Sequence, residues 1–187
     1  MTSTTAVQIP GYVVGTWDID ASHSTVGFSV RHMMVSKVRG YFRQFSGEIV
    51  AAEDPAQSSV TATIDLSSID TRQKQRDAHI RSADFFDVEN HPQMSFRSTA
   101  VRTDGADWSI DGELTIKGRT RPVTLALELN GFGPDAYGGT RAGFSARTEI
   151  SRSEFGVDIQ MPMDGGGVVV GDKISVELEI EAVLRAQ

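Results

Sequence analysis

The segment KISVELEIEAVLR at residues 173–185 decides the fold of this chain. One parity holds Ile174, Val176, Leu178, Ile180, Ala182 and Leu184, and the other holds Ser175, Glu177, Glu179 and Glu181. Successive side chains of a β-strand point to opposite faces, so a strand here has one apolar face and one acidic face. A helix would distribute the glutamates around its whole circumference. The segment therefore predicts a strand that packs on a core with one side and meets water with the other.

The same alternation returns along most of the chain. It defines eight runs, at residues 12–34, 38–52, 58–69, 93–103, 107–117, 121–131, 140–151 and 172–185. Three glycine-containing pairs that suit tight turns are expected between runs, namely Asp104-Gly105, Lys117-Gly118 and Asn130-Gly131. Short connections favour an antiparallel meander, and strands with one apolar face hide their edges by closing on themselves. We therefore predict an all-β fold, an eight-stranded antiparallel β-barrel.

The interior of such a barrel is either filled by side chains or large enough for one small ligand. The parity predicts an interior lined by Phe28, Val30, Phe42, Ile64, Leu66, Met94, Phe96, Leu114, Leu125 and Phe144. Small residues at other inward positions leave room between these side chains: Ala62, Gly112, Ala142 and Ala146. On the pattern alone, both a packed and a ligand-holding interior remain open.

Residues 70–90 break the alternation and are too long for a hairpin turn, so they predict a short helical insertion. Asp70 is a plausible N-cap, Asp77 is expected to pair with Arg81 one turn later, and Pro92 ends the helix. The insertion is basic at one end and carries Phe85 and Phe86 at the other. It is either a lid that meets an anionic head group, or a solvated helix whose phenylalanines plug the barrel.

Length and composition indicate one domain, which we place at residues 12–187 after an N-terminal extension at 1–11. The net charge of −7, with scattered basic residues, disfavours nucleic acid as a partner. The first residues lack the basic and apolar regions of a secretory signal, so we expect a cytoplasmic protein. No apolar run is long enough for stable membrane insertion. The glycine-rich segment at residues 161–171 predicts a flexible loop.

The chain offers no compact catalytic or metal-binding motif. Cysteine is absent, and His23, His32, His79 and His91 are too scattered for a zinc or copper site, so we expect no metal cofactor. The Gly-x-Ser-x-Gly elbow of serine hydrolases is missing. We therefore assign no catalytic residues.

Several segments resemble one known family, the YceI-like, polyisoprenoid-binding proteins. They extend through nearly the whole chain: HSxVxFxVRH at 23–32, GxFxxFxG at 40–47, SIDT at 68–71, RDxHIRSxDFF at 76–86, LTIKGxTxPV at 114–123, SRSEFG at 151–156 and VGD at 170–172. The resemblance implies a lipocalin-like barrel with a helical insertion, often dimeric. It also implies an elongated cavity for an isoprenoid chain, such as a polyprenyl diphosphate, a quinone or a related amphiphile.

A charged head group has to lie where the cavity meets water, because burying it unpaired is prohibitive. His32 shares the parity of Phe28 and Val30, so we expect it to point inward. We expect the polar contacts to come from His32 and from Arg76, His79 and Arg81 of the insertion, with Phe86 on the tail. In the competing interpretation, Asp77 and Asp84 neutralise the arginines and only hold the helix against the barrel.

Three functions remain from different classes. The leading one is non-catalytic binding, carriage or sequestration of an isoprenoid or similar lipid, with no cofactor besides that lipid and with a homodimer as a possible assembly. The second is an enzyme that acts on such a lipid through His32, His79 and Asp77. The third is a closed structural barrel with a packed core and a protein partner.

Overall fold

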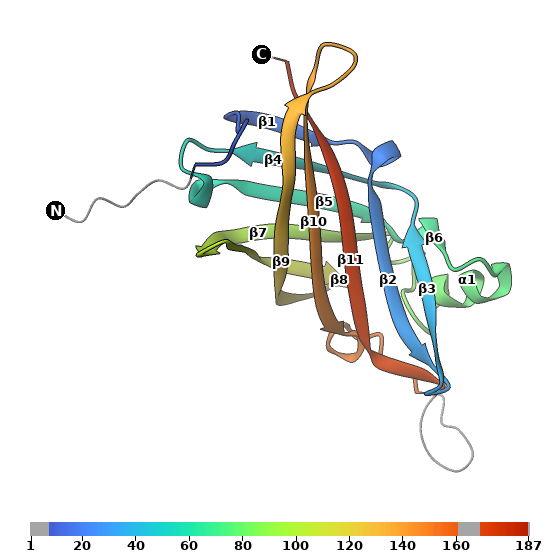
Figure 1. Cartoon of the computed structure of the whole chain (residues 1–187). Helices are drawn as coiled ribbons and strands as arrows, with labels where there is room; N and C mark the ends of the chain where they lie inside the picture. The colour runs from blue at the N-terminus through green and yellow to red at the C-terminus, as the bar shows by residue number, and fades with distance from the viewer. Residues whose placement is uncertain (1–7, 161–168, 187) are drawn as a thin grey trace.

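The chain forms one antiparallel sheet that closes on itself (Figure 1). The computed structural model describes residues 8–160 and 169–186, so most of the glycine-rich loop expected at 161–171 lies outside it. The strands are β1 (Gly15–Ile19), β2 (Thr25–His32), β3 (Ser36–Phe42), β4 (Phe45–Ala51), β5 (Ser59–Asp65), β6 (Ile69–Asp70), β7 (Gln93–Asp104), β8 (Asp107–Ile116), β9 (Arg119–Pro134), β10 (Thr140–Ser151) and β11 (Val170–Leu184). One α-helix, α1 (Lys74–Arg81), lies between β6 and β7. No helix in the described part of the chain has the length and apolar character needed to cross a membrane.

The first three barrel strands are each broken into two pieces. β1 and β2 both pair with β11, with Trp17 opposite Leu184 and Val30 opposite Ile174. In the same way β3 and β4 pair with β2 and β1, and β6 and β5 pair with β3 and β4. Each pair is therefore one interrupted barrel strand, and β7 to β11 supply the other five. The predicted eight-stranded antiparallel barrel is confirmed, and the pairing of β1 with β11 closes it.

The turns agree with the sequence prediction at two of three positions. Lys117 and Gly118 have φ values of 54° and 75° and form the two-residue turn between β8 and β9. Gly105, with φ of 64°, lies between β7 and β8. The turn at Asn130-Gly131 is wrong, because β9 continues through both residues.

A β-bulge explains this error. The register between β9 and β10 shifts where Gly143 lies opposite Gly131 and Phe144 lies opposite Leu129. Gly131 has φ of 148°, which a glycine adopts readily. The reversal of the chain comes later, at residues 135–139, where the Asp135 side chain accepts hydrogen bonds from two backbone N–H groups. An Asn-Gly pair can therefore mark either a hairpin turn or a β-bulge, and the sequence alone does not distinguish the two.

The insertion is helical over residues 74–81 only, and the rest of the predicted 70–90 range consists of the end of β6, turns and irregular backbone. The cap expected at Asp70 is wrong: the Gln73 side chain accepts from the backbone N–H of Arg76 and caps the helix. Asp70 belongs to β6 and pairs with Arg43 of the β3–β4 corner at 3.1 Å. Asp70 is therefore held by the β6 strand and by Arg43, and is not available to cap the helix.

Candidate functional site

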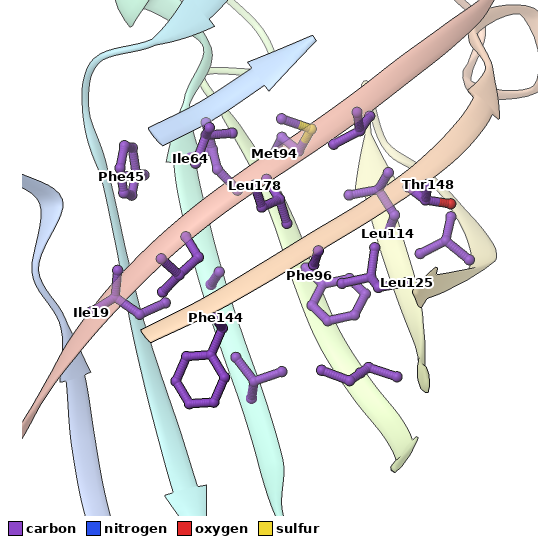
Figure 2. Close-up of a pocket in the computed structure, with 18 of the residues that line it drawn as sticks. Ile19, Phe45, Ile64, Met94, Phe96, Leu114, Leu125, Phe144, Thr148 and Leu178 are labelled. Carbon is purple, nitrogen blue, oxygen red and sulfur yellow. The ribbon is translucent and has the colours of Figure 1, made fainter. Parts of the chain in front are cut away.

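The barrel encloses a cavity of about 340 Å³, which Figure 2 shows from close by. Strands from all sides contribute inward side chains, among them Ile19, Phe45, Ile64, Leu125 and Leu178. Ile80, Phe85 and Phe86 reach it from the insertion. Ile9 does so from the segment expected to be an extension outside the barrel. The volume is in the range of small-molecule sites, and nearly every contributing side chain is apolar.

Side-chain burial shows why the interior is hollow. Most of the buried apolar residues form two separate clusters, one with Phe42, Leu66 and Phe155 and the other around Trp17 and Ala182. The cavity touches both clusters. Apolar residues such as Phe96, Phe144 and Leu178 line the cavity and stay only half-buried, because part of their surface faces empty space.

Glycines under two aromatic rings widen the cavity further. A Cβ on Gly40 would lie 2.3 Å from Cζ of Phe28, and a Cβ on Gly112 would lie 2.4 Å from Cζ of Phe96. Each ring therefore lies over a glycine and along the barrel wall instead of projecting to the centre. Of the small inward residues expected from the sequence, Ala62 and Ala146 line the cavity and Gly112 makes space for the Phe96 ring. Ala142 is instead buried in the cluster around Trp17.

The structure places most of the predicted interior residues on this cavity. Those that line it are Phe28, Val30, Phe42, Ile64, Phe86, Met94, Phe96, Leu114, Leu125 and Phe144. Leu66 is completely buried but lies in the packed cluster, outside the lining. His32 is half-buried at the end of β2 and is also outside the lining. The inward parity of His32 therefore does not bring its side chain into the cavity lining.

The basic residues of the insertion make contacts within the insertion and not with the cavity. Arg76 donates to the side-chain and backbone oxygens of Thr71 at 2.8 and 2.6 Å. Thr71 in turn donates twice to the buried carboxylate of Asp77, so the expected pairing of Asp77 with Arg81 is wrong. These bonds tie the start of the helix to the strand before it. Arg81 is half-buried and lies outside the cavity lining.

His79 also makes its contacts outside the cavity. Its Nε2 lies 2.9 Å from a carboxylate oxygen of Asp84, and both side chains are exposed. Its ring packs edge-on against Phe85, with the ring centroids 5.0 Å apart. The insertion thus presents its phenylalanines to the cavity, whereas Arg76, His79 and Arg81 lie outside the lining.

Arg152 is the single charged residue among the described residues that line the cavity. Its guanidinium is buried and donates four hydrogen bonds, all to backbone carbonyls, those of Val157, Ile159, Val170 and Gly171. Burial lowers the pKa of Arg152, and the carbonyl dipoles offset part of the cost of placing a cation there. A guanidinium has five N–H donors, so one remains for another partner.

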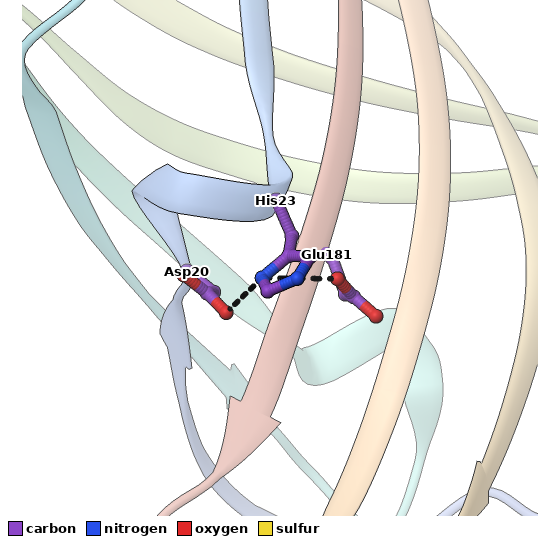
Figure 3. A group of neighbouring side chains, drawn as sticks. All are labelled: Asp20, His23 and Glu181. Atoms are coloured by element: carbon purple, nitrogen blue, oxygen red, sulfur yellow. Dashed lines mark hydrogen bonds and ion pairs between the residues drawn. The ribbon is translucent and has the colours of Figure 1, made fainter. Parts of the chain in front are cut away.

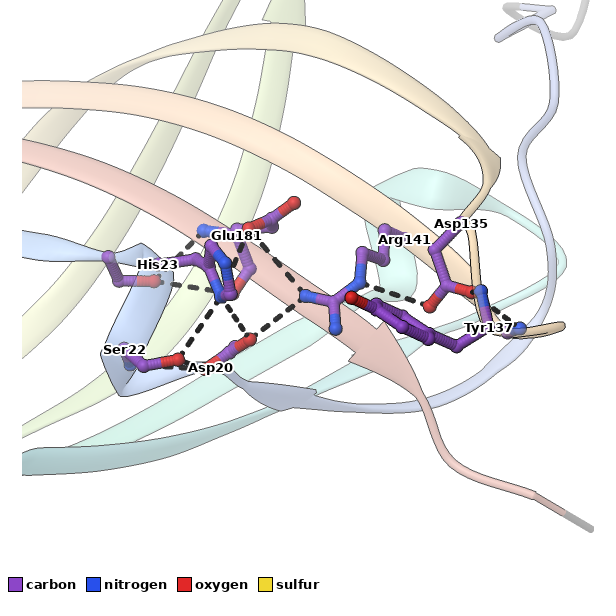
Figure 4. A network of polar contacts seen from close by, with 9 residues as sticks. Asp20, Ser22, His23, Asp135, Tyr137, Arg141 and Glu181 are labelled. Atoms are coloured by element: carbon purple, nitrogen blue, oxygen red, sulfur yellow. Dashed lines mark hydrogen bonds and ion pairs between the residues drawn. The ribbon is translucent and has the colours of Figure 1, made fainter.

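A second cluster of ionisable groups lies outside the cavity, at the corner between β1 and β2 (Figure 3). Asp20, His23 and Glu181 each offer a ligand atom within 4.8 Å of the others, close enough for a metal ion. Arg141 already occupies this position: its Nη1 lies 2.9 Å from Asp20 and 3.6 Å from Glu181 (Figure 4). Hydrogen bonds from Arg141 and Ser22 hold the pKa of Asp20 far below its ordinary value.

This cluster acts as an ion-pair network. The Nε of Arg141 also donates to Asp135 of the β9–β10 turn at 3.1 Å. The network thereby joins the β1–β2 corner to β10, β11 and that turn, at the seam where the barrel closes. A metal ion would have to displace the guanidinium, so the donor set favours the arginine.

Comparison with known proteins identifies the family of this chain. The sequence model of the YceI-like domain matches residues 17–182. The chain belongs to the YceI-like family. Protein YceI of Escherichia coli is 42% identical over 141 residues, which is 75% of this chain and 74% of that protein.

Solved structures agree on the YceI-like fold. BcnA of Burkholderia cenocepacia superposes with a TM-score of 0.75 at 26% identity, covering 87% of this chain and 98% of that one. A YceI protein of Campylobacter jejuni gives 0.69 at 27% identity, covering 83% and 90%. A polyisoprenoid-binding domain of Saccharophagus degradans gives 0.68 at 14% identity, covering 90% and 98%, and shows the shared fold alone.

Reasoning from the sequence missed several residues of this YceI-like site. Trp17 and Trp108 both line the cavity, and the parity of Trp108 with Leu114 was a usable signal for it. Arg152 lies in the motif at residues 151–156, but nothing in the sequence indicated its burial, because arginine after a strand is ordinarily solvated. Arg141 was equally hidden, since its partners come from distant parts of the chain.

Proposed function

We propose that the protein binds an isoprenoid or similar long-chain amphiphile inside the barrel, and carries or sequesters it without catalysis. The observation that carries this proposal is the continuous apolar cavity between two packed clusters. Burial of a tail contributes about 0.8 kcal/mol per CH₂ group, so few polar contacts are needed for affinity. The name of the polyisoprenoid-binding neighbour and the membership of the YceI-like family support the same ligand class.

The tail would contact the lining residues that come from both halves of the barrel, with Phe28, Phe96 and Phe144 among them. We propose Arg152 for the polar end, in place of His32, Arg76, His79 and Arg81, which lie outside the lining. Its positive charge and remaining N–H suit a hydroxyl, a quinone oxygen or a phosphate. The proposed orientation therefore puts the head toward β11 and the segment after β10.

The non-catalytic part of the proposal has its own support. Acid–base or nucleophilic catalysis needs two or more reactive groups within hydrogen-bond distance of a substrate atom. Among the described lining residues the polar groups are hydroxyls, indole N–H groups and the Arg152 guanidinium. None of the hydroxyls there is paired with a histidine or a carboxylate, so no activated nucleophile faces the cavity.

Tryptophan fluorescence provides a direct test, because both tryptophans of the chain line the cavity. We expect titration with geranylgeraniol to change the emission saturably, and geranylgeranyl diphosphate to bind more tightly if its charge meets Arg152. Native mass spectrometry of the purified protein should show a co-purifying lipid. Absence of binding for both probes would refute the proposal, and release of phosphate from the diphosphate would establish the enzyme instead.

The Arg76→Gln/Arg81→Gln variant separates the two placements of the head group. If Arg152 meets the head, this variant keeps the wild-type ratio of the affinities for diphosphate and alcohol. A selective loss of affinity for the diphosphate would show that the head group contacts the insertion instead.

A further inference from the structure

The connection between β2 and β3 exposes three consecutive apolar residues. Met33, Met34 and Val35 have exposed fractions of 44%, 54% and 84%. Single exposed apolar residues are ordinary, whereas contiguous exposed apolar patches are typical of contact sites, and these three residues are consecutive. In Figure 1 this tip lies at the lower end of the barrel, opposite the β9–β10 turn.

The turn itself does not favour these residues. Met33 and Met34 have φ values of 51° and 62°, and the N–H of Val35 donates to the carbonyl of His32. Two successive positive φ angles belong to the type I′ hairpin turn, which strongly prefers Asn-Gly. Bulky side chains are strained in this region. Two methionines therefore cost stability here, and local folding gives no reason for them.

The strands beside the tip also carry an unfavourable pair of like charges. Arg31 lies directly opposite Lys37, and like charges at opposed positions destabilise a sheet. Arg39 is two residues further along β3, on the same face and also exposed. Within the described residues no carboxylate lies within ion-pair distance of these three side chains.

The charge of this region contrasts with that of the whole chain. Residues 21–47 contain four arginines and lysines and no aspartate or glutamate, although the chain carries −7 overall. Asp172, in the irregular part of β11 opposite the end of β2, is engaged by Ser151 and Ser153. The hairpin is thus a basic, apolar-tipped element on an acidic protein.

The same hairpin lies at one end of the cavity. Val30 of β2 lines the cavity three residues before the tip, as does Ile174, its partner on β11. Val170, opposite His32, also lines it. Arg152 bonds to the carbonyl of Val170, so the proposed polar end of the ligand lies toward this end as well.

We propose that the β2–β3 hairpin docks the barrel on an anionic lipid bilayer. Met33, Met34 and Val35 enter the interfacial region, and Arg31, Lys37 and Arg39 contact the lipid phosphates. Docking places the cavity end next to the membrane that supplies or receives the lipid. That role in lipid transfer rests on the proposed function, whereas docking itself does not.

Two variants test the surface while leaving the fold intact. Met33→Asn/Met34→Gly installs the residues that the turn prefers, and Lys37→Glu replaces the like-charge pair with an opposite-charge one. Both should keep or raise the melting temperature. Both should lower co-sedimentation with phosphatidylcholine vesicles containing about one third phosphatidylglycerol by at least about tenfold. Tyr137→Ser, at the exposed turn of the opposite end, is the control and should sediment like the wild type.

Each result of this experiment bears on the proposal. It is overturned if the wild type sediments equally with neutral and anionic vesicles, or if both variants sediment like the wild type. If the variants change the oligomeric state in size-exclusion chromatography while their vesicle binding is unaltered, the hairpin is a contact between two copies of the chain. This result would also overturn the proposal. Fluorescence titration with detergent-solubilised geranylgeraniol measures the cavity separately, so loss of the proposed function and loss of docking are distinguishable.

Discussion

Replacing Ala146 with phenylalanine tests whether the cavity is the binding site. Ala146 lines the cavity from β10, and its side chain is one of the small ones that keep the interior open. The substitution adds six carbon atoms to the space that a ligand tail would fill. At about 0.8 kcal/mol per CH₂ group, excluding six tail carbons costs at most about 5 kcal/mol of binding free energy.

A tail that shifts along the cavity recovers part of this loss. Since about 1.4 kcal/mol corresponds to a factor of ten in affinity, we expect Ala146→Phe to weaken binding of geranylgeraniol between about tenfold and about a thousandfold. The new ring is itself buried among apolar side chains, so the melting temperature should stay constant or rise. Affinity is therefore expected to fall without a loss of stability.

The assay is tryptophan fluorescence titration, and the neighbouring strand offers a matched control. Ala126 of β9 lies opposite Arg147, the residue next to Ala146, and its side chain is exposed. Ala126→Phe adds the same ring to the outside of the barrel and should bind like the wild type. If Ala146→Phe retains wild-type affinity with an unchanged fold, the ligand does not occupy this cavity and the reasoning fails.

Three further changes have expected outcomes. Gly40→Ala places a Cβ 2.3 Å from the Phe28 ring and should lower the free energy of unfolding in urea by about 1–3 kcal/mol; an unchanged midpoint would contradict the close packing. Hydrogen bonds from Arg102 lower the pKa of Asp111 to about 2, so this pair stabilises the fold above the ordinary pKa near 3.8 and loses its effect as the pH falls toward 2. The difference in melting temperature between wild type and Arg102→Gln should therefore close over that range, and a constant difference would count against the ion pair. Arg152→Met leaves four backbone carbonyls without a donor and should cost at least about 3 kcal/mol in chemical denaturation, with Arg152→Lys intermediate; a fully stable Met variant would show that water replaces the guanidinium.

Local patterns in the sequence are enough to predict most strands, the faces of each strand and the antiparallel order. Alternation has a period of two, so it is visible within a single segment such as 173–185 without knowledge of any partner. The turn at Lys117-Gly118 was equally local, because positive φ angles at two successive positions restrict the residue types. The motifs at residues 23–32 and 76–86 identified the family for the same reason: they are contiguous.

The interruptions of the strands and the content of the interior depend on pairings between segments far apart in the chain. At the breaks after β1, β3 and β5 both pieces keep the same neighbouring barrel strand, and the parity of the inward residues changes across the break, for example from Ile64 to Ile69. The position of Asn130-Gly131 inside β9 depends on the register with β10, which the two residues do not encode.

The cavity and its charged residue depend on distances between segments far apart in the chain. Phe28 leaves space because Gly40 lies beneath its ring, and Arg152 is buried because carbonyls of later residues surround it. Neither fact follows from the residue types, since phenylalanine ordinarily fills a core and arginine is ordinarily solvated. A barrel is hollow when the volume that its sheet encloses exceeds the summed volume of the inward side chains. The side-chain volume can be read from the sequence, but the enclosed volume is set only when the eight strands close into the barrel.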